Sequence, residues 1–464
     1  MNIVASFVIG AVTAVAPVTT TPLSWQDCGD GLRCGRMEVP ADWARPTGER
    51  ISLDLALLPA RDQAAKKGAL VVNLGGPGPQ IAMLRQGGKD ALADLTRWFD
   101  VVIFDPRGFG KSSGVSCPTP ASFEAEWVFP SKSAYNAYAA KNHRFGQACR
   151  KAAGPLAGNL NSWQMARDLD AIRTALGQNK LNYYGNSHGT VIGQAYAEFF
   201  PGNVGRMFLD SVVDHTNRSI GDWLKPRANT LERSLHRFAE WCAKTSTCSL
   251  YGQNAVAVWD EVISKARRQP IPAPAGGTGS KVSAALIVAR ASFTQERSWP
   301  RLATALAQAR AGDASLFLQT PGAPDPDLSR IMLCADFPYP SSYRDLKALE
   351  KDLRRASPHV GWRAVWPMAN HCAGLPSVKA FAPHPFRAPG LPPVLITSGE
   401  YDDNTPPQDS RRLTALLPGA RYLPAVGGHA LYLGGHPCVR KHAHRYLTTG
   451  TIPPAGAACG PAAS

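Results

Sequence analysis

Residues 181–190 read Leu-Asn-Tyr-Tyr-Gly-Asn-Ser-His-Gly-Thr, and this stretch decides the fold of the chain. It contains Gly-x-Ser-x-Gly, with β-forming residues before the pattern and a helical pattern of small and apolar residues after it. A sharp strand-to-helix turn of this kind, a nucleophile elbow, exposes its serine above a sheet. Gly185 and Gly189 let such a turn approach its neighbours closely. The stretch therefore predicts Ser187 as a nucleophile.

The segments around the elbow alternate between short apolar runs and amphipathic helical patterns. Apolar or β-branched runs predict strands at residues 51–58, 68–73, 101–104, 206–209, 393–397 and 422–426. A helix is expected over residues 162–176, where apolar residues recur at spacings of four and three and Asn161 or Ser162 can cap the start. This alternation predicts an α/β fold with a mostly parallel sheet and helices on both of its faces.

The pattern changes in the middle of the chain. Residues 219–385 lack strong parallel-strand runs, and Pro/Gly-rich segments interrupt their helical patterns at 270–277 and 321–324. A mainly helical cap inserted between two core strands explains this better than a tandem domain, because the core is incomplete without the C-terminal strands. We assign residues 1–24 to a leader, 25–215 and 386–464 to the two parts of the core, and 216–385 to the cap.

The composition narrows the class of protein. The 464 residues are 44% hydrophobic and 18% charged, which is typical of a globular chain. The formal charge of +15 is spread over scattered arginines, without a basic run or an arginine–aromatic stripe. Nucleic-acid binding is therefore not supported. Beyond the N-terminus no apolar run is long enough to span a bilayer, so no membrane span is expected.

Cysteine usage and the N-terminus both indicate export. The ten cysteines form no C-x-x-C pair, and an even number spread along the chain suits disulfides in an exported protein. We expect neighbours to pair, since each pair closes a local loop, although ten buried thiols in a cytosolic enzyme are the alternative. Residues 3–18 are apolar and Ala14-Val15-Ala16 resembles a signal cleavage site, but no Lys or Arg precedes the run and Pro17 follows it. The chain is expected to be secreted, either free or associated with the cell envelope.

A serine nucleophile needs a base and an acid, which in this arrangement follow it in the order acid, then histidine. Asp402 follows the strand at 393–397, and His429 follows the strand at 422–426. His429 is the expected general base and Asp402 the group that orients it. The rivals are Asp403 for the acid, and His188 and His436 for the base.

A glycine cluster after an early strand completes the expected site. Residues 73–78 read Asn-Leu-Gly-Gly-Pro-Gly and are suited to present a backbone N–H. The amides of Gly76 and His188 are the expected oxyanion donors. The alternative is a tight turn without a catalytic role.

Taken together, these motifs resemble the α/β-hydrolase peptidases of the prolyl aminopeptidase group. The shared motifs are the Gly-Gly-Pro-Gly loop, Asp105-x-Arg107-Gly108-x-Gly110-x-Ser112, the elbow, and Gly-x-x-Asp402-x-x-Thr405-Pro406. More narrowly, the chain resembles secreted actinobacterial tripeptidyl aminopeptidases in Trp25-x-x-Cys28, Cys34 with Val39-Pro40-Ala41-Asp42-Trp43, Ala166-Arg167-Asp168-Leu169-Asp170, Cys334-x-Asp336, Cys438 and Cys459. The resemblance implies an α/β-hydrolase fold and a serine exopeptidase. Such an enzyme releases short peptides, here tripeptides, from free N-termini through an acyl-enzyme, without a metal or cofactor.

The chain departs from the family pattern at two places. Pro79, Gln80 and Ile81 stand where the family continues the glycine loop with Gly-Ser-Gly, and His188 stands where an aromatic residue usually follows the serine. Both changes border the acyl pocket.

An aminopeptidase must also bind the substrate's ammonium group, which calls for a carboxylate under the cap. The candidates are Asp336, Glu296 and Asp222, and Asp336 is preferred because a disulfide at Cys334 could fix its position. A structural salt bridge is the alternative role for Asp336. Two other functions stay open, since the same triad serves any acyl transfer. One is an esterase or amidase acting on a small secondary metabolite, and the other is a non-catalytic binding protein on a hydrolase scaffold.

Overall fold

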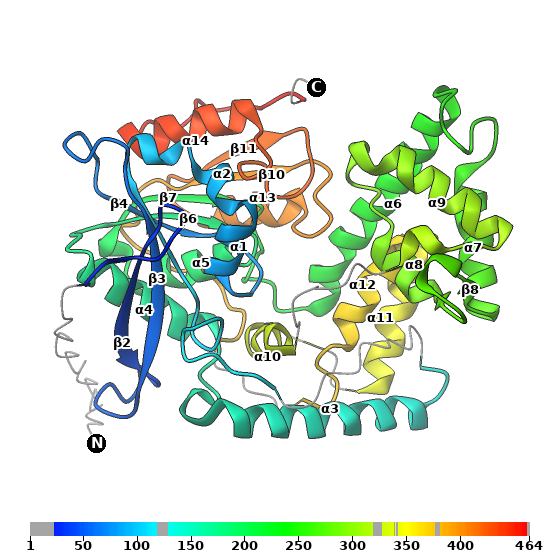
Figure 1. Ribbon diagram of the computed structural model, residues 1–464, viewed down its shortest axis with the longest axis horizontal. Coiled ribbons are helices and arrows are strands. Elements are labelled where there is room, and N and C mark those ends of the chain that lie inside the picture. Colours follow the sequence, from blue (N-terminus) through cyan, green and yellow to red (C-terminus); the bar gives the residue numbers. More distant parts are fainter. Residues whose placement is uncertain are drawn as a thin grey trace, which may run out of the picture.

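The computed structural model describes residues 23–117, 129–318, 327–337, 339, 342–375 and 381–461. Nearly all of the expected leader, and the Pro/Gly-rich segment at 321–324, lie outside these residues. Figure 1 shows a sheet with its covering helices on one side of the molecule and a group of helices on the other. Within the described part, no helix combines the length and apolarity needed to cross a bilayer.

Among the described residues, the central sheet contains nine strands in the order β1-β2-β3-β5-β4-β6-β7-β10-β11. Their bounds are β1 Gln26–Asp27, β2 Arg33–Pro40, β3 Arg50–Leu58, β4 Ala69–Asn73, β5 Asp100–Phe104, β6 Leu181–Asn186, β7 Val204–Asp210, β10 Leu395–Gly399 and β11 Arg421–Ala425. From β5 through β11 all neighbouring strands are parallel, whereas β1, β2 and β3 add an antiparallel edge. The prediction of a mostly parallel sheet is confirmed.

The two faces of the sheet pack against different helices. Along β4, Ala69 and Val71 belong to one buried apolar cluster, and Leu70 and Val72 belong to another. Successive side chains of a strand point to opposite faces, so this alternation marks a sheet that is buried on both sides. The first cluster includes residues of α4 and α5, and the second includes residues of α14.

The helices near the sheet are α1 Gln80–Met83, α2 Lys89–Leu92, α3 Lys132–Ala153, α4 Ser162–Ala175, α5 Gly189–Phe199, α13 Pro407–Leu416 and α14 Pro437–Thr449. The α4 helix matches the expectation for residues 162–176. Its N-cap is Asn161, whose side chain accepts a hydrogen bond from the amide of Gln164 at 3.1 Å. Met165, Leu169 and Ile172 are fully buried, so the predicted apolar stripe faces the core.

Between β7 and β10 the chain is mainly helical. This segment contains α6 Ile220–Lys244, α7 Ala255–Arg268, α8 Ala284–Arg290, α9 Trp299–Ala311, α10 Asp327–Asp336, α11 Tyr343–Ala356 and α12 Gly361–Asn370, together with the short strands β8 Ile271–Pro272 and β9 Lys281–Val282. We call α6–α12 the cap. The cap has its own apolar core, rich in the aromatic residues Trp223, Phe238, Trp259, Trp299, Trp362 and Trp366.

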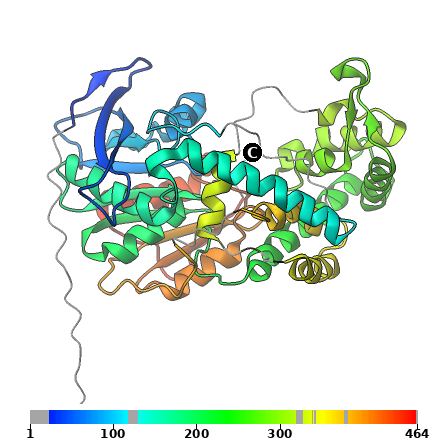
Figure 2. The same ribbon diagram turned by 90° about the horizontal axis from the view of Figure 1, so that it is seen from below.

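The buried apolar clusters do not follow the sequence limits that we assigned to the cap. Tyr135, near the start of α3, belongs to the buried cluster of the cap, whereas Phe145 further along α3 belongs to a cluster of the sheet. In the opposite sense, Leu328 and Met332 of α10 pack with the sheet cluster. Figure 2 shows α3 running along both parts of the molecule.

All ten cysteines form disulfides, each with its neighbour in the sequence, as we expected. The pairs are Cys28–Cys34, Cys117–Cys149, Cys242–Cys248, Cys334–Cys372 and Cys438–Cys459. The second pair joins α3 to the loop after β5, and the fourth joins α10 to the segment after α12. Cys149 of the second pair and Cys334 of the fourth line the same pocket, between α3 and α10.

Candidate active site

Ser187 occupies the sharp turn between β6 and α5. Its φ of 52° lies in the left-handed region, which a residue with a side chain adopts only where its surroundings hold it. The Ser187 amide donates to the carbonyl of Asp210 at 3.0 Å. A Cβ on Gly185 would lie 2.7 Å from the Gly189 carbonyl oxygen, and a Cβ on Gly189 would lie 2.7 Å from Oδ1 of Asn73. Glycine at both positions therefore lets the turn close against its neighbours.

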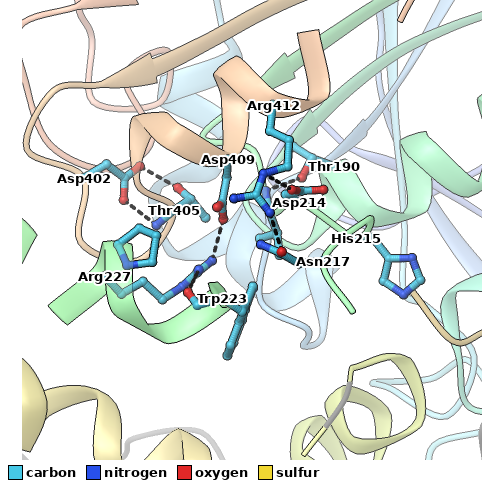
Figure 3. A network of polar contacts seen from close by, with 12 residues as sticks. Thr190, Asp214, His215, Asn217, Trp223, Arg227, Asp402, Thr405, Asp409 and Arg412 are labelled. Atoms are coloured by element: carbon cyan, nitrogen blue, oxygen red, sulfur yellow. Dashed lines mark hydrogen bonds and ion pairs between the residues drawn. The ribbon is translucent and has the colours of Figure 1, made fainter. Parts of the chain in front are cut away.

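A hydrogen-bonded carboxylate and imidazole lie on the loops after β10 and β11. Nδ1 of His429 lies 2.9 Å and 3.0 Å from the two carboxylate oxygens of Asp402. Thr405 holds the same carboxylate, donating from its amide at 2.8 Å and from its hydroxyl at 2.6 Å (Figure 3). A Cβ on Gly399 would collide with the carbonyl oxygen of Gly428, so glycine there lets the two loops meet.

The surroundings favour an ionised Asp402 and a basic His429. Burial alone would raise the pKa of Asp402, but His429 and the hydrogen bonds from Thr405 outweigh burial and bring this pKa below its usual value. Burial alone would lower the pKa of His429, but the charges of Asp402, Asp210 and Asp403 outweigh it and raise this pKa above the usual value. With Nδ1–H donated to Asp402, Nε2 of a neutral His429 is left to accept a proton.

Asp403 and His436, two of the rivals for the acid and the base, have surroundings that differ from those of Asp402 and His429. Burial, followed by the charge of Asp402, raises the pKa of Asp403 to about 6. The carboxylate that accepts from Nδ1 of His429 is that of Asp402. His436 stands at the N-terminus of α14, where Nδ1 accepts from the amide of Val439 and Nε2 lies 3.1 Å from the Gly460 carbonyl oxygen. This geometry gives His436 a helix-capping role.

The glycine loop after β4 packs directly against the elbow. Gly75 and Gly76 both have a φ of 109°, which glycine adopts without a steric penalty. A Cβ on Gly75 would lie 3.1 Å from Cβ of Ser187. Nδ2 of Asn186, the residue before the serine, donates to the carbonyl of Leu74 at 2.9 Å. The loop is thus placed to present an N–H beside the serine.

His188, the third rival, begins α5 with its side chain buried. Its Nε2 lies 3.8 Å from Oδ2 of Asp336 and has no hydrogen-bond partner among the described residues. The imidazole of His188 is therefore directed toward α10, and Asp402 is bonded to His429.

A model of the alpha/beta hydrolase fold family matches residues 69–435. The chain belongs to the α/β-hydrolase family. Tripeptidyl aminopeptidase of Streptomyces lividans is 28% identical over 98% of this chain and 90% of its own length. Serine protease Hip1 of Mycobacterium tuberculosis is 29% identical over 97% of this chain and 93% of its own. Carboxylesterase B of the same species is 28% identical over 97% of this chain and 92% of its own length. The similarity identifies this α/β-hydrolase as a serine hydrolase.

The three carboxylates expected to bind an ammonium group have different surroundings in this α/β-hydrolase. Asp336 is fully buried and accepts hydrogen bonds from the amide of Ser162 at 3.1 Å and from its hydroxyl at 2.7 Å. Glu296 is exposed and paired with Arg237. Asp222 is exposed in the first turn of α6. The structure thus encloses the preferred candidate and leaves the other two at the surface of the cap.

A buried polar network joins α6 of the cap to α13 of the α/β-hydrolase core (Figure 3). Nη2 of Arg227 donates to Asp409 at 2.9 Å, and both side chains are almost fully buried. Next to this pair, Nε of Arg412 lies 3.4 Å from the carboxylate of Asp214. Further along α6, the guanidinium of Arg237 stacks 3.4 Å from the ring centroid of Tyr401, the residue before Asp402. The cap is therefore in contact with the loop that carries the carboxylate.

The carboxyl group of Asp210 lies beside the site and was not among the predicted site residues. Asp210 ends β7, is fully buried and accepts a hydrogen bond from the amide of Tyr432, three residues after His429, at 2.8 Å. Burial raises the pKa of Asp210 to about 7. Its place at the end of a core strand is its one local sequence signal, and an exposed aspartate at a strand end has the same signal.

Proposed function

We propose that this protein is a secreted serine exopeptidase that releases short peptides, specifically tripeptides, from free N-termini. One observation supports it above the others, namely the bonded pair of His429 and Asp402 on the loops beside the elbow of Ser187, in a chain whose similarity to a tripeptidyl aminopeptidase runs over nearly its whole length. The five disulfides support an exported protein.

In the proposed acylation step, Nε2 of His429 takes the hydroxyl proton of Ser187 while the serine oxygen attacks the scissile carbonyl carbon. The carbonyl oxygen becomes an oxyanion that the amides of Gly76 and His188 stabilise. Asp402 accepts Nδ1–H and stabilises the imidazolium. His429 then passes the proton to the leaving amine, the C–N bond breaks, and an acyl-enzyme remains.

In the proposed deacylation step, His429 takes a proton from water and the resulting hydroxide attacks the ester carbonyl. The second tetrahedral intermediate uses the same oxyanion donors. When the bond to Ser187 breaks, the serine oxygen recovers the proton from His429 and the short peptide leaves with a free carboxylate. Neither step draws on a cofactor.

Recognition of a free N-terminus requires a carboxylate that a substrate can reach. Asp336 is enclosed and hydrogen-bonded to Ser162, so Glu296 and Asp222 are the two candidates that are accessible in this conformation. Glu296 has to exchange its pairing with Arg237 for the substrate's ammonium group.

An esterase is the second candidate, because a similar chain of comparable length is named Carboxylesterase B. Elbow, base and acid are equally suited to cleave an ester. The two functions differ in what they require of the substrate's N-terminus.

Tripeptide arylamides with a free or an acetylated N-terminus test the proposal. We expect cleavage of the free substrate, rejection of the acetylated one, and loss of activity in Ser187→Ala, with Ser249→Ala at an exposed position as the matched control. Covalent labelling by a fluorophosphonate, followed by mapping of the labelled residue, places the nucleophile. Cleavage of both substrates favours the esterase or amidase alternative, which does not require a free N-terminus, and an unlabelled Ser187 overturns the mechanism and favours the binding protein.

A further inference from the structure

The buried side-chain amide of Gln80 is hydrogen-bonded to the backbone of the glycine loop, residues 73–78. Gln80 is the first residue of α1, and its side chain is fully buried. Its Oε1 accepts a hydrogen bond from the amide of Leu74 at 2.7 Å. Its Nε2 donates to the carbonyls of Gly75 at 2.8 Å and Gly78 at 2.9 Å. One side chain thus bonds three backbone groups of the loop, on both sides of Gly76.

The loop needs such support because of its own sequence. A glycine at a φ of 109° has no Cβ to restrict it, so it adopts this conformation easily and leaves it easily. Gly75 and Gly76 are consecutive residues of this kind, and Gly75 touches the elbow at Ser187. An N–H in this segment keeps one direction only if neighbouring groups hold the backbone.

Other groups also contact the loop. The amide of Gly75 donates to Oδ1 of Asn73 at 3.0 Å. The hydroxyl of Ser329, on α10, donates to the carbonyl of Pro77 at 2.7 Å. The carboxylate of Asp105 accepts from the amide of Ile81 at 2.8 Å. Asn186 bonds the carbonyl of Leu74. Of these groups, only the side chain of Gln80 bonds residues both before and after Gly76.

We propose that Gln80 is a positioning residue for the oxyanion hole, which fixes the direction of the Gly76 N–H without touching the substrate. This inference rests on the proposed function. A carboxamide is suited to the task because it combines an acceptor for the Leu74 amide with donors for two carbonyls. An oxyanion donor acts on charge that develops in the transition state, so a displaced donor slows the chemical step more than it weakens substrate binding.

Two variants separate positioning from support of the fold. Gln80→Met keeps the length of the side chain and removes all three hydrogen bonds. Gln80→Glu keeps the shape and the acceptor but places an oxygen against the Gly75 and Gly78 carbonyls. Gln178→Met is the matched control, because this partly buried glutamine accepts from the backbone amide of Ala69 at the opposite end of β4.

The rates to measure are kcat and KM on the free tripeptide arylamide and the rate of phosphonylation by a fluorophosphonate. Rates are expressed per titrated active site, so that a loss of folded protein lowers the amplitude and not the rate. We expect both Gln80 variants to lose about 10- to 100-fold in kcat, with KM within about threefold of the parent. Phosphonylation slows in parallel, because the phosphoryl oxygen gains charge in the same hole, and Gln178→Met keeps the parental rates.

A parental kcat per titrated site in both Gln80 variants overturns the inference, as does a rise in KM with kcat unchanged. A parent protein that neither cleaves the arylamide nor reacts with the fluorophosphonate overturns the proposed function itself. The two failures are therefore distinguishable in the same set of measurements.

Discussion

Asp402→Asn is expected to lower the acylation rate of Ser187 about 10⁴-fold, with little effect on substrate binding. Both oxygens of Asp402 lie within 3.0 Å of Nδ1 of His429 and hold the proton there. An asparagine directs an NH₂ donor or a weaker neutral acceptor at Nδ1, so that the proton moves to Nε2 and the imidazole can no longer accept from the serine. Stopped-flow or discontinuous phosphonylation assays measure the loss.

The pH profile of the same variant checks the cause. The base must be neutral to accept a proton, so the rate falls as the pH drops through the pKa of His429. Because this pKa is raised in the parent, the acid limb is expected above the usual histidine value of about 6.5. Removal of the Asp402 charge lowers the pKa of His429 and moves the acid limb toward lower pH.

Asp403→Asn is the matched control for Asp402→Asn. The charge of Asp403 also raises the pKa of His429, so its removal moves the limb in the same direction by a smaller amount. No hydrogen bond between His429 and its acid is lost, and most of the rate is retained. If Asp403→Asn were the variant with the 10⁴-fold loss, the assignment of the acid would be wrong.

Arg107→Met is expected to reduce the free energy of unfolding by about 3–5 kcal/mol. Both side chains of the Arg107–Asp168 pair are fully buried, with Nε to Oδ2 at 2.7 Å and Nη2 to Oδ1 at 2.5 Å. Arg107 also donates to the carbonyl of Ala41 at 2.7 Å, and Nε1 of Trp43 donates to Asp168 at 2.8 Å. Removal of the guanidinium leaves a buried carboxylate without its cation. Urea unfolding followed by tryptophan fluorescence measures the effect.

An exposed pair of the same types is the control. Arg36 and Asp54 also make a bidentate contact, at 2.6 Å and 3.3 Å, but the Arg36 side chain is 59% exposed. Arg36→Met is expected to cost less than about 1 kcal/mol. The double variant Arg107→Met/Asp168→Leu should recover part of the loss, because no lone charge stays buried. Equal losses at the two sites would contradict the role of burial.

The elbow and the core strands could be predicted because their signals are local. Gly-x-Ser-x-Gly between a β-forming run and a helical pattern predicts a turn whose glycines have close neighbours in the structure, and α4 matches its predicted range and cap. The strand β2 was missed, because it lies near the edge of the sheet and buries only Met37, Val39 and Pro40. The apolar signal of such a strand is weak.

Features that depend on distant partners could not be predicted. Asp336 stood out because of its proximity to Cys334, but its surroundings are set by Ser162 on α4, 174 positions away in the chain. Asp210 has no local pattern that separates it from a surface aspartate at a strand end. Its burial comes from the loop that carries His429, which lies more than 200 residues later.

The helix α3 prevents the cap from being exchanged as a module by itself. It precedes the elbow in the sequence, yet it contributes Tyr135 to the core of the cap, and Cys149 near its other end is bonded to Cys117. Excision of residues 216–385 would remove the residues that cover the apolar surface at the start of α3. The Cys117–Cys149 disulfide would still attach α3 to the core, so that surface would be exposed. A shortened enzyme or a chimera with a relative's cap therefore has to exchange α3 as well, so the unit of recombination is discontinuous in the gene.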